Sequence, residues 1–560
     1  MATEHVDVVV VGSGFGGSVA TYRLADAGLR VVLLERGRAY PPGSFPRTQH
    51  EMTRSFWNPA SDRFGMFNVW SFDGIEALVS AGLGGGSLIY ANVLLRKPPE
   101  WFVAQEAYGG VEERWPIRYE DLEPHYDRVE PMLGAQRFPF DVAPYSAARK
   151  TRALKEAAER LGLDWTLPPL AVTFGNDGEA PVPGEPIREP FPNLHGRTRY
   201  TCRLCGECDV GCNYGSKNSL DYNYLSAAQR AGADVRTLSE VRTFEPRPGG
   251  GFTVRYVRHE PGEDGRPPRE YPVELTADRL VLSAGTLGST FLLLKNRAAF
   301  PHLSGRLGDR FCGNGDLLSF AMRCTEDDEG GRRTRDLGPT FGPVITSTIR
   351  VPDTRDGGDG RGFYVQDAGF PAFVTWLVEA SDVGGTVRRL LRLAGRRIRA
   401  RLRRDPRTDI TAEIARALGA CDLSASSLPL LGMGRDVPDG RLYLDTDDHL
   451  ACTWSIGSSR PFFERVRGTM ADVAAAWGGA FVPNPTYRIS RVITVHPLGG
   501  CPMGSGPEHG VVDAYGEAFG HPGLYVADGS VMPGPVGPNP ALTIAALADR
   551  TADRILDQTS

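Results

Sequence analysis

The sequence predicts a mixed α/β protein, α+β overall, that opens with a βαβ unit and later passes through a mainly antiparallel region. The first observation is a pair of short apolar runs, Val8 to Val11 and Leu29 to Leu34, separated by a glycine-rich junction and a helical stretch. The second is a change in the sequence pattern after about Asp316, where strand-like segments such as LLSFAMRC, PVITSTIRV and FVTWLVEA follow one another. The opening unit is typical of a Rossmann-like dinucleotide-binding domain.

Gly12, Gly14 and Gly17 follow the first strand in G-x-G-x-x-G spacing, with Phe15 inside the motif. These glycines predict, in order, a sharp turn, a close approach of backbone to a pyrophosphate, and close contact between helix and strand. The N-terminus of the helix offers unpaired N–H groups and a positive dipole to the phosphates. Glu35 ends the second strand, where a carboxylate can accept hydrogen bonds from a ribose diol. The unit therefore predicts a bound dinucleotide.

Two further glycine-rich stretches could lie against the same ligand. The segment from Ala81 to Asn92 has little side-chain bulk, which suits backbone that a cofactor must approach, although a flexible loop has the same composition. A buried strand from Leu280 to Ala284 ends at Gly285 and an apolar helix, which repeats the strand–glycine–helix pattern. The candidate residues of the first stretch are Gly82, Gly84, Gly85, Gly86, Ser87 and Asn92.

Length and charge limit the remaining possibilities. A chain of 560 residues predicts two or three domains, and a net charge of −5 gives no general attraction to nucleic acid. No stretch approaches eighteen apolar residues, the length that a membrane span needs, and the first strand starts too early to leave room for a signal peptide. We therefore expect a cytoplasmic protein whose nine cysteines are thiols or metal ligands rather than disulfides.

Four of these cysteines, Cys202, Cys205, Cys208 and Cys212, follow a C-x-x-C-x-x-C-x-x-x-C pattern. Bacterial ferredoxin loops wrap an iron–sulfur cluster with this spacing, although Asn213 replaces the proline that usually follows. Structural zinc more often uses two separated pairs. An iron–sulfur cluster, a zinc ion and four metal-free thiols all remain open.

Two other regions carry chemical signals. Residues 387–404 contain nine arginines around one apolar face, which predicts a basic amphipathic helix; it is either a solvated surface helix or a peripheral contact to an anionic membrane. Near the C-terminus, His496, Asp528 with Gly529, and Asn539 with Pro540 stand at junctions between loops and regular elements, where ligand sites usually lie.

The chain resembles the glucose–methanol–choline (GMC) oxidoreductase family, in its cholesterol oxidase branch, over nearly its whole length. The resemblance rests on the motifs VVVVGSGFGGSVATYRLADAG, GLGGGSL, LDYNYLSAA, VLSAGTLGST, HPLGGCPMG and LYVADGSVMPGPVGPNPALTIAALADR. It implies FAD as the dinucleotide, with Glu35 at the adenosine ribose and residues 82–87 against flavin and pyrophosphate. It also implies cofactor contacts from Asn92, Val241, Ala284, Gly285, Asp528, Gly529, Asn539 and Pro540. Under this resemblance, residues 1–130, 200–315 and 485–560 form the FAD-binding domain, and residues 131–199 and 316–484 the substrate-binding domain.

The resemblance further implies that His496 and Asn539 face the flavin across a substrate hydroxyl. Oxidation of an alcohol needs a hydride acceptor, here flavin N5, and a group that takes the hydroxyl proton; an imidazole can accept that proton, and a neutral amide can hold the oxygen. We expect a bulky apolar secondary alcohol, steroid-like or alicyclic, with O2 or an external acceptor taking the electrons. The alternatives are a dehydrogenase that passes electrons through an iron–sulfur cluster, and a double-bond isomerase of steroids or terpenoids.

One departure from the family concerns the substrate site. Cholesterol oxidases of this type carry a glutamate base that shifts the steroid double bond, and Gln366 stands where that glutamate is expected, upstream of Trp376. An amide cannot act as a carboxylate base. Asp367 is adjacent, but strand alternation points it to the opposite face. Gln366 and Trp376 are therefore candidate substrate-site residues in an enzyme whose isomerase step is in doubt.

Overall fold

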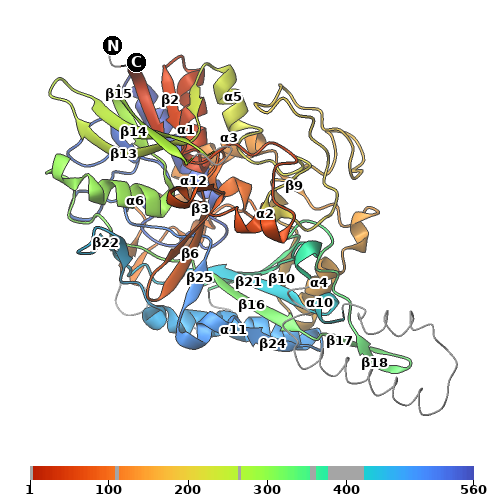
Figure 1. Cartoon of the computed structure of the whole chain (residues 1–560). Coiled ribbons are helices and arrows are strands. Elements are labelled where there is room, and N and C mark those ends of the chain that lie inside the picture. Colours follow the sequence, from red (N-terminus) through yellow and green to blue (C-terminus); the bar gives the residue numbers. More distant parts are fainter. Residues whose placement is uncertain (1–3, 107–111, 263–266, 354–360, 376–421, 560) are drawn as a thin grey trace.

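The computed structural model describes residues 4–106, 112–262, 267–353, 361–375 and 422–559. Two large β-sheets occupy opposite ends of the molecule, and the N- and C-termini lie together at the end that holds the first sheet (Figure 1).

The first sheet is built around a parallel core in the order β12-β2-β1-β15-β26. The buried valine run of the opening segment forms its central strand, because a strand that has neighbours on both sides and is buried on both faces has no exposed position to fill with polar residues. The five strands are β1 (Glu4–Val11), β2 (Val31–Leu34), β12 (Asp234–Arg236), β15 (Arg269–Leu282) and β26 (Leu524–Val526). The chain thus returns to this sheet after almost 250 residues spent elsewhere, since β26 pairs with the end of β15.

A meander extends this sheet. β13 (Ser239–Pro246) and β14 (Phe252–Glu260) pair antiparallel, and β14 pairs with the first half of β15. The sequence predicts one strand from Val235 to Val241, whereas the structure divides it into β12 and β13. The reason is Leu238, whose φ of 52° turns the chain.

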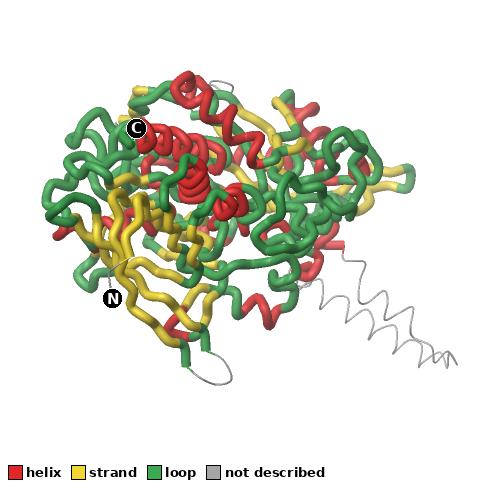
Figure 2. Tube along the Cα trace, turned by 90° about the horizontal axis from the view of Figure 1, so that it is seen from above, coloured by secondary structure: helices red, strands yellow, loops and turns green. Residues whose placement is uncertain are grey.

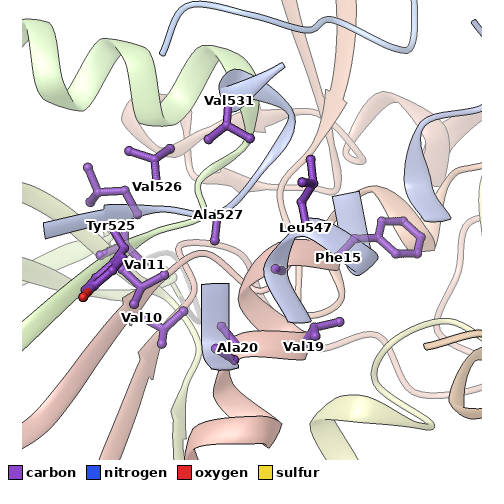
Figure 3. Close-up of a cluster of buried hydrophobic side chains, with 14 of the residues drawn as sticks. Val10, Val11, Phe15, Val19, Ala20, Tyr525, Val526, Ala527, Val531 and Leu547 are labelled. Carbon is purple, nitrogen blue, oxygen red and sulfur yellow. The ribbon is translucent and has the colours of Figure 1, made fainter. Parts of the chain in front are cut away.

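Helices cover one face of the parallel core. α1 (Phe15–Asp26) packs against α5 (Tyr224–Arg230) and α12 (Ala541–Asp557), and α12 packs against α3 (Tyr119–Leu133). α1 also lies beside the strands and the segment from Tyr525 to Val531, whose buried side chains meet those of β1 and α1 (Figure 3). The predicted helix from Ser219 begins later, at Tyr224. Its cap is Asn223, whose Oδ1 accepts a hydrogen bond from the backbone N–H of Tyr224.

The second sheet is antiparallel throughout, in the order β10-β19-β20-β21-β16-β24. α11 (Ile456–Ala476) packs along this sheet and also contacts α4 (Arg149–Leu161) (Figure 1). The sheet and these two helices enclose a second hydrophobic core. The strands are β10 (Asp164–Thr166), β16 (Leu317–Met322), β19 (Thr348–Val351), β20 (Phe363–Asp367), β21 (Leu428–Gly434) and β24 (Ala480–Pro483). The division of the chain into two domains at the boundaries given above stays a prediction.

Smaller elements complete the described chain, and Figure 2 shows how much of it is loop. A three-stranded sheet, β5-β6-β25, lies between the two large ones and matters for the site because β25 leads into His496. The remaining bounds are β3 (Trp57–Asn58), β4 (Arg63–Phe64), β5 (Phe67–Ser71), β6 (Ile75–Ser80), β7 (Ala104–Glu106), β8 (Glu112–Arg114), β9 (Gln136–Arg137), β11 (Pro169–Leu170), β17 (Thr325–Asp328), β18 (Gly331–Thr334), β22 (Leu442–Leu444), β23 (Leu450–Cys452), β25 (Val492–Thr494), α2 (Gln49–Thr53), α6 (Gly285–Lys295) and α10 (Asp422–Ala425).

The prediction of a strand in the segment FVTWLVEA is wrong for the part of this segment that the structure describes. Residues Ala372–Val374 form a turn of 3-10 helix that follows Pro371, whose ring fixes φ at −63° and removes a ladder donor. Trp376 and residues 387–404 lie outside the described residues, so their predicted roles at the substrate and at a membrane stay predictions. Within the described chain, no helix has the length and apolar character of a membrane span.

Candidate functional site

The opening glycine motif is built as tightly as its spacing predicts. Gly12 has φ of 98°, and a Cβ there would lie 2.3 Å from the carbonyl oxygen of Ser283. A Cβ on Gly17 would lie 1.9 Å from the carbonyl oxygen of Gly12, which is the close helix–strand contact. Gly14 differs, since no heavy atom outside its immediate chain neighbours lies within 4 Å of a Cβ placed there. The side-chain position at Gly14, the N-cap of α1, therefore faces open space, and no described side chain caps the helix.

The second glycine-rich stretch packs onto the first. A Cβ on Gly85 would lie 2.6 Å from the Cα of Gly14. The hydroxyl of Ser13 joins the two stretches, because it donates to Oε2 of Glu35 at 2.6 Å and accepts the N–H of Gly84 at 3.0 Å. Oε1 of Glu35 accepts the N–H of Gly37 at 2.8 Å. Glu35 thus lies at the end of β2, beside both glycine-rich stretches.

The side chain of Asn92 is a buried amide that indicates a ligand-binding position. It is fully buried, and neither its Oδ1 nor its Nδ2 has a hydrogen-bond partner among the described residues. A buried amide without partners is costly, so such a group needs a ligand or water beside it. Phe15 at the start of α1 stacks edge-on to Tyr90 at 5.4 Å, which places this segment beside the N-terminus of α1.

At the third junction, Asp528 links α6 to the segment after β26. Its Oδ2 accepts from the N–H of Gly285 and the hydroxyl of Ser289, and its Oδ1 accepts from the N–H and hydroxyl of Ser530. Burial raises the pKa of Asp528. The carboxylate therefore shapes the junction through protein contacts, while a Cβ on Gly285 would meet open space. Gly529 follows directly in a tight turn of 3-10 helix, and Val241 lies buried on β13.

These observations fit FAD, an elongated dinucleotide. The open N-terminus of α1 at Gly14 suits the pyrophosphate. Glu35 at the end of β2 suits the adenosine side, and the unpartnered amide of Asn92 offers both a donor and an acceptor. Pro540 precedes α12, whose N-terminus has no side-chain cap either.

His496 is held by a carboxylate. Its Nδ1 lies 2.8 Å from Oδ1 of Asp316, whose side chain is almost fully buried. Oδ2 of the same carboxylate accepts from the hydroxyl of Thr494 at 3.0 Å, the N–H of Val495 at 2.8 Å and the N–H of His496 at 3.2 Å. Because every neighbour of the carboxylate donates to it, the imidazole proton lies on Nδ1, and Nε2 presents a lone pair when the ring is neutral.

Asn539 lies between two further side chains. Its Oδ1 accepts a hydrogen bond of 3.0 Å from Nε2 of Gln366. Asn314 holds the segment just before it, since Nδ2 donates to the carbonyl of Pro538 at 3.0 Å and Oδ1 accepts the N–H of Gly537 at 2.9 Å. Asn314 and Asp316 belong to one loop, so a single turn of chain contacts both the His496 segment and the Asn539 segment.

Comparison with known proteins agrees with this geometry. A family model described as GMC oxidoreductase matches residues 470–548, and one described as FAD dependent oxidoreductase matches residues 7–166. A cholesterol oxidase from Mycobacterium tuberculosis is 34% identical over 562 residues, which cover 98% of this chain and 90% of that protein. The chain belongs to the GMC oxidoreductase family. A cholesterol oxidase from Acinetobacter baumannii is 27% identical over 98% of this chain and 94% of its own length.

The fold agrees as well. The crystal structure of pyridoxine 4-oxidase from Mesorbium loti matches 99% of both chains with a TM-score of 0.57 and 19% identity. This GMC protein is therefore an FAD-dependent oxidoreductase, which confirms the predicted fold class, the enzyme class and the principal cofactor.

The predicted opposition of Gln366 and Asp367 on β20 is present in the structure. Gln366 faces Asn539, whereas Asp367 accepts hydrogen bonds from the N–H groups of Thr346 and Ser347 and pairs with Nζ of Lys150 at 3.3 Å. Both members of this ion pair are fully buried. Asp367 is engaged in holding two strands together, so it cannot replace the missing glutamate.

The four clustered cysteines line one cavity, which also includes Lys217. Eight cysteines lie in the described chain, and all eight are free thiols. Burial raises the pKa of Cys202 and of Cys208, and burial lowers that of Lys217 to about 8.

A second charged group of possible ligands lies elsewhere. In the described part of the chain, His125, Asp549 and Asp553 form the one group of His, Cys, Asp or Glu side chains whose ligand atoms all lie within 4.8 Å of one another. Arg23 and Arg128 already pair with both carboxylates. We read this cluster as the ionic contact among α1, α3 and α12.

Sequence reasoning missed Ser13, Asn314 and Asp316. Ser13 lies inside the recognised motif at a position that the motif leaves free. Asn314 and Asp316 lie in the sequence Gly313-Asn-Gly-Asp316, where alternating glycines and short polar residues signal a strained turn. Asn314 has φ of 54° and Gly315 has φ of 67°, so the turn was detectable, although its partners were not.

Proposed function

We propose that this enzyme oxidises a secondary alcohol on a bulky apolar substrate, steroid-like or alicyclic, as its cholesterol oxidase relatives do by name. The observation that carries the proposal is the turn containing Asn314 and Asp316. It contacts both the His496 ring and the Asn539 segment, and so assembles a base and an amide from distant parts of the chain.

The two side chains have complementary roles. Nε2 of His496 accepts the hydroxyl proton, because Nδ1 already carries the proton shared with Asp316. The amide of Asn539 donates to the substrate oxygen, since its Oδ1 is occupied by Gln366. FAD, when bound, supplies the hydride acceptor.

The surroundings of Gln366 favour an apolar substrate. Gln366 pairs with Leu431 across the sheet, and Tyr364, on the same face of β20, has its side chain buried. Oε1 of Gln366 is buried and has no hydrogen-bond partner in the part of the chain that the structure describes, which leaves one polar acceptor in an apolar setting. Such a site is typical of pockets that bind a mostly hydrocarbon ligand through a few polar contacts.

Replacement of His496 tests the proposal. His496→Ala that still holds FAD should lose flavin reduction by a steroid or alicyclic alcohol by about a hundredfold or more, which is the usual contribution of one general base. Anaerobic stopped-flow absorbance measures this rate. His302→Ala, which changes an exposed histidine, is the matched control and should reduce at the parental rate. Parental flavin reduction in His496→Ala would refute the assignment.

We propose as a second candidate that the cysteine cavity holds an iron–sulfur cluster, through which electrons leave to an external acceptor. The support is the convergence of Cys202, Cys205, Cys208 and Cys212 on one cavity.

The sulfur positions argue against a single zinc ion. Tetrahedral zinc with Zn–S bonds of about 2.3 Å holds its sulfurs about 3.8 Å apart. Among the described residues, no three cysteine sulfurs lie within 4.8 Å of one another.

Iron and acid-labile sulfide analysis of the purified protein separates the cluster from metal-free thiols. Stoichiometric iron and sulfide, lost in Cys205→Ser and kept in Cys324→Ala, would support a cluster that serves a dehydrogenase. Protein that contains FAD but no iron or sulfide after anaerobic purification would exclude it. Peroxide would then be the expected product in air.

A peripheral membrane contact through residues 387–404 is tested by co-sedimentation with liposomes, which should depend on salt and on anionic lipid.

A further inference from the structure

The carboxylate of Asp316 does more than contact His496. Its Oδ2 is surrounded by three donors, from Thr494, Val495 and His496 itself, which leaves only Oδ1 to face the imidazole. The backbone N–H groups of Val495 and His496 cannot change from donor to acceptor. The orientation of the carboxylate, and therefore the atom that it presents to Nδ1, is fixed by the backbone.

We propose that Asp316 is the positioning residue that fixes the tautomer of His496 and so makes Nε2 the proton acceptor of the reaction. The proposal rests on the proposed function, since it concerns the proton that His496 takes from the alcohol. An ionised carboxylate can only accept hydrogen bonds, so the neutral imidazole must carry its proton on Nδ1. Nε2 then holds the free lone pair, and the substrate hydroxyl can donate to it.

The other charged groups near this loop do not provide an alternative orienter. Asp436 accepts the N–H of Gly313 at 2.9 Å, and the charged or titratable groups that act on its carboxyl are Arg361, Asp316 and Cys312. In the described chain, the contacts of the His496 ring nitrogens with carboxylates are limited to Asp316. The imidazole proton is therefore set by one residue.

Asp316→Asn is a sharp test, because the backbone also decides how the new amide must sit. The amide nitrogen cannot face the N–H groups of Val495 and His496, so the amide oxygen takes the place of Oδ2. The NH2 group then takes the place of Oδ1 and donates to Nδ1 of the imidazole. The neutral ring must carry its proton on Nε2, and Nε2 can no longer accept the proton of the alcohol.

The first measurement is the tautomer itself. In protein labelled with 15N-histidine, long-range 1H–15N spectra of the holoenzyme should show the His496 proton on Nδ1, with the signal assigned by its loss in His496→Gln. In Asp316→Asn the proton should lie on Nε2. An Nε2–H tautomer in the parental enzyme overturns the proposal, and this holds even if Asp316→Asn does not fold.

The second measurement is the pH profile of flavin reduction under anaerobic conditions. We expect Asp316→Asn to reduce its flavin about a hundredfold more slowly near neutral pH, since a general base contributes about that much. We also expect its pH profile of flavin reduction to differ in shape from that of the parental enzyme, because the proton lies on the other ring nitrogen. A parental rate together with a parental profile would overturn the inference.

Asp549→Asn is the matched control. It changes a second buried pair of the same geometry, since Nδ1 of His125 lies 2.8 Å from Oδ2 of Asp549. It should lower stability and leave the pH profile of flavin reduction unchanged, so a purely structural effect of losing a buried carboxylate is distinguished from a tautomer effect. If His496→Ala is itself without effect, the proposed function fails; if His496→Ala is slow and Asp316→Asn is not, only the inference fails.

Discussion

Gln366 donates a hydrogen bond of 3.0 Å from Nε2 to Oδ1 of Asn539. Gln366 belongs to the antiparallel sheet and Asn539 precedes α12 on the parallel one, so the bond joins the two halves of the molecule at the proposed site. Because it occupies the oxygen of Asn539, the amide hydrogens of that residue are left for the substrate. A glutamate at position 366 could not make this donation when ionised.

The first prediction concerns the identity of residue 366. The parental enzyme should not shift the double bond of a β,γ-unsaturated steroid ketone above the buffer rate, because β20 offers an amide at the site and a carboxylate, Asp367, only on its other face. Gln366→Glu should accelerate that shift by about a hundredfold, the usual effect of a positioned base. Ultraviolet absorbance of the conjugated product follows the reaction without any need for flavin reduction.

Gln366→Glu should also slow alcohol oxidation. Its carboxylate would repel Oδ1 of Asn539 and turn that amide away from the orientation in which it donates to the substrate. Gln366→Leu is the control: it removes the donor without adding a base, so oxidation should slow and no isomerisation should appear. Isomerisation by the parental enzyme at the rate of Gln366→Glu would show that another group acts as the base.

The second prediction concerns Asn314. Asn314→Gly keeps the positive φ of 54° without strain but removes the contacts to Gly537 and Pro538. We expect flavin reduction to fall by at least about tenfold and the free energy of unfolding to fall by roughly 1–3 kcal/mol, as for a buried group that loses its partner. Stopped-flow absorbance and urea unfolding measure the two effects.

Asn314→Asp is the comparison for this position. It retains the acceptor for the N–H of Gly537 and loses the donor to Pro538. If both contacts contribute, its free energy of unfolding should lie between those of the parental protein and Asn314→Gly. A rate equal to that of the parental enzyme in Asn314→Gly would mean that the Asn539 segment holds its position unaided.

The third prediction separates two glycines of one motif. Gly14→Ala should fold with a free energy of unfolding within about 0.5 kcal/mol of the parental apoprotein, because φ is −69° and the added methyl meets no protein atom. It should bind FAD more weakly, since the methyl occupies the space in front of α1. Gly17→Ala should fail earlier, in folding itself, because its methyl would meet the carbonyl of Gly12.

Flavin fluorescence on titration of apoprotein measures the affinity in this experiment. Gly468→Ala, an exposed helix position with open space around it, is the control and should leave FAD affinity unchanged. Equal FAD affinity in Gly14→Ala and Gly468→Ala would place the pyrophosphate elsewhere.

The fourth prediction concerns the pH dependence of stability. Burial raises the pKa of Asp436 to about 7, and the side chain is fully buried. The unfolded chain titrates this carboxyl near pH 3.9. Between about pH 4 and pH 7 the folded protein therefore holds a proton that the unfolded chain has lost, so stability falls as pH rises through this window, by a few kcal/mol.

Asp436→Asn removes this titration. The difference in free energy of unfolding between Asp436→Asn and the parental protein should shift in favour of the variant between pH 5 and pH 8, as measured by urea unfolding. Parallel curves over this range would show that Asp436 does not change its protonation on unfolding.

The sequence pattern predicted those parts of the fold that depend on neighbouring residues alone. The apolar runs Val8 to Val11 and Leu29 to Leu34 were expected as strands, and the first lies within β1 while the second contains β2, because a short apolar run is a property of neighbouring residues. The strand that divides at Leu238 and the 3-10 turn after Pro371 were missed, since one turning residue overrides the propensity of the residues around it.

The candidate site could be predicted only in part for a different reason. His496 and Asn539 stand in recognisable motifs, whereas Asp316 and Asn314 act through partners 180 and 223 positions away. No periodicity in a single sequence encodes such a contact. The glycine-rich turn indicated that the backbone is special there, and only the folded chain shows what the turn contacts.

The hydroxyl of Ser13 ties two distant parts of the chain together. It donates to Glu35 and accepts from Gly84, so the end of β2 and the second glycine-rich stretch keep one spacing. The spacing therefore depends on a side chain that the glycine motif itself leaves free to vary, and a substitution at that single position would disturb both sides of the site at once.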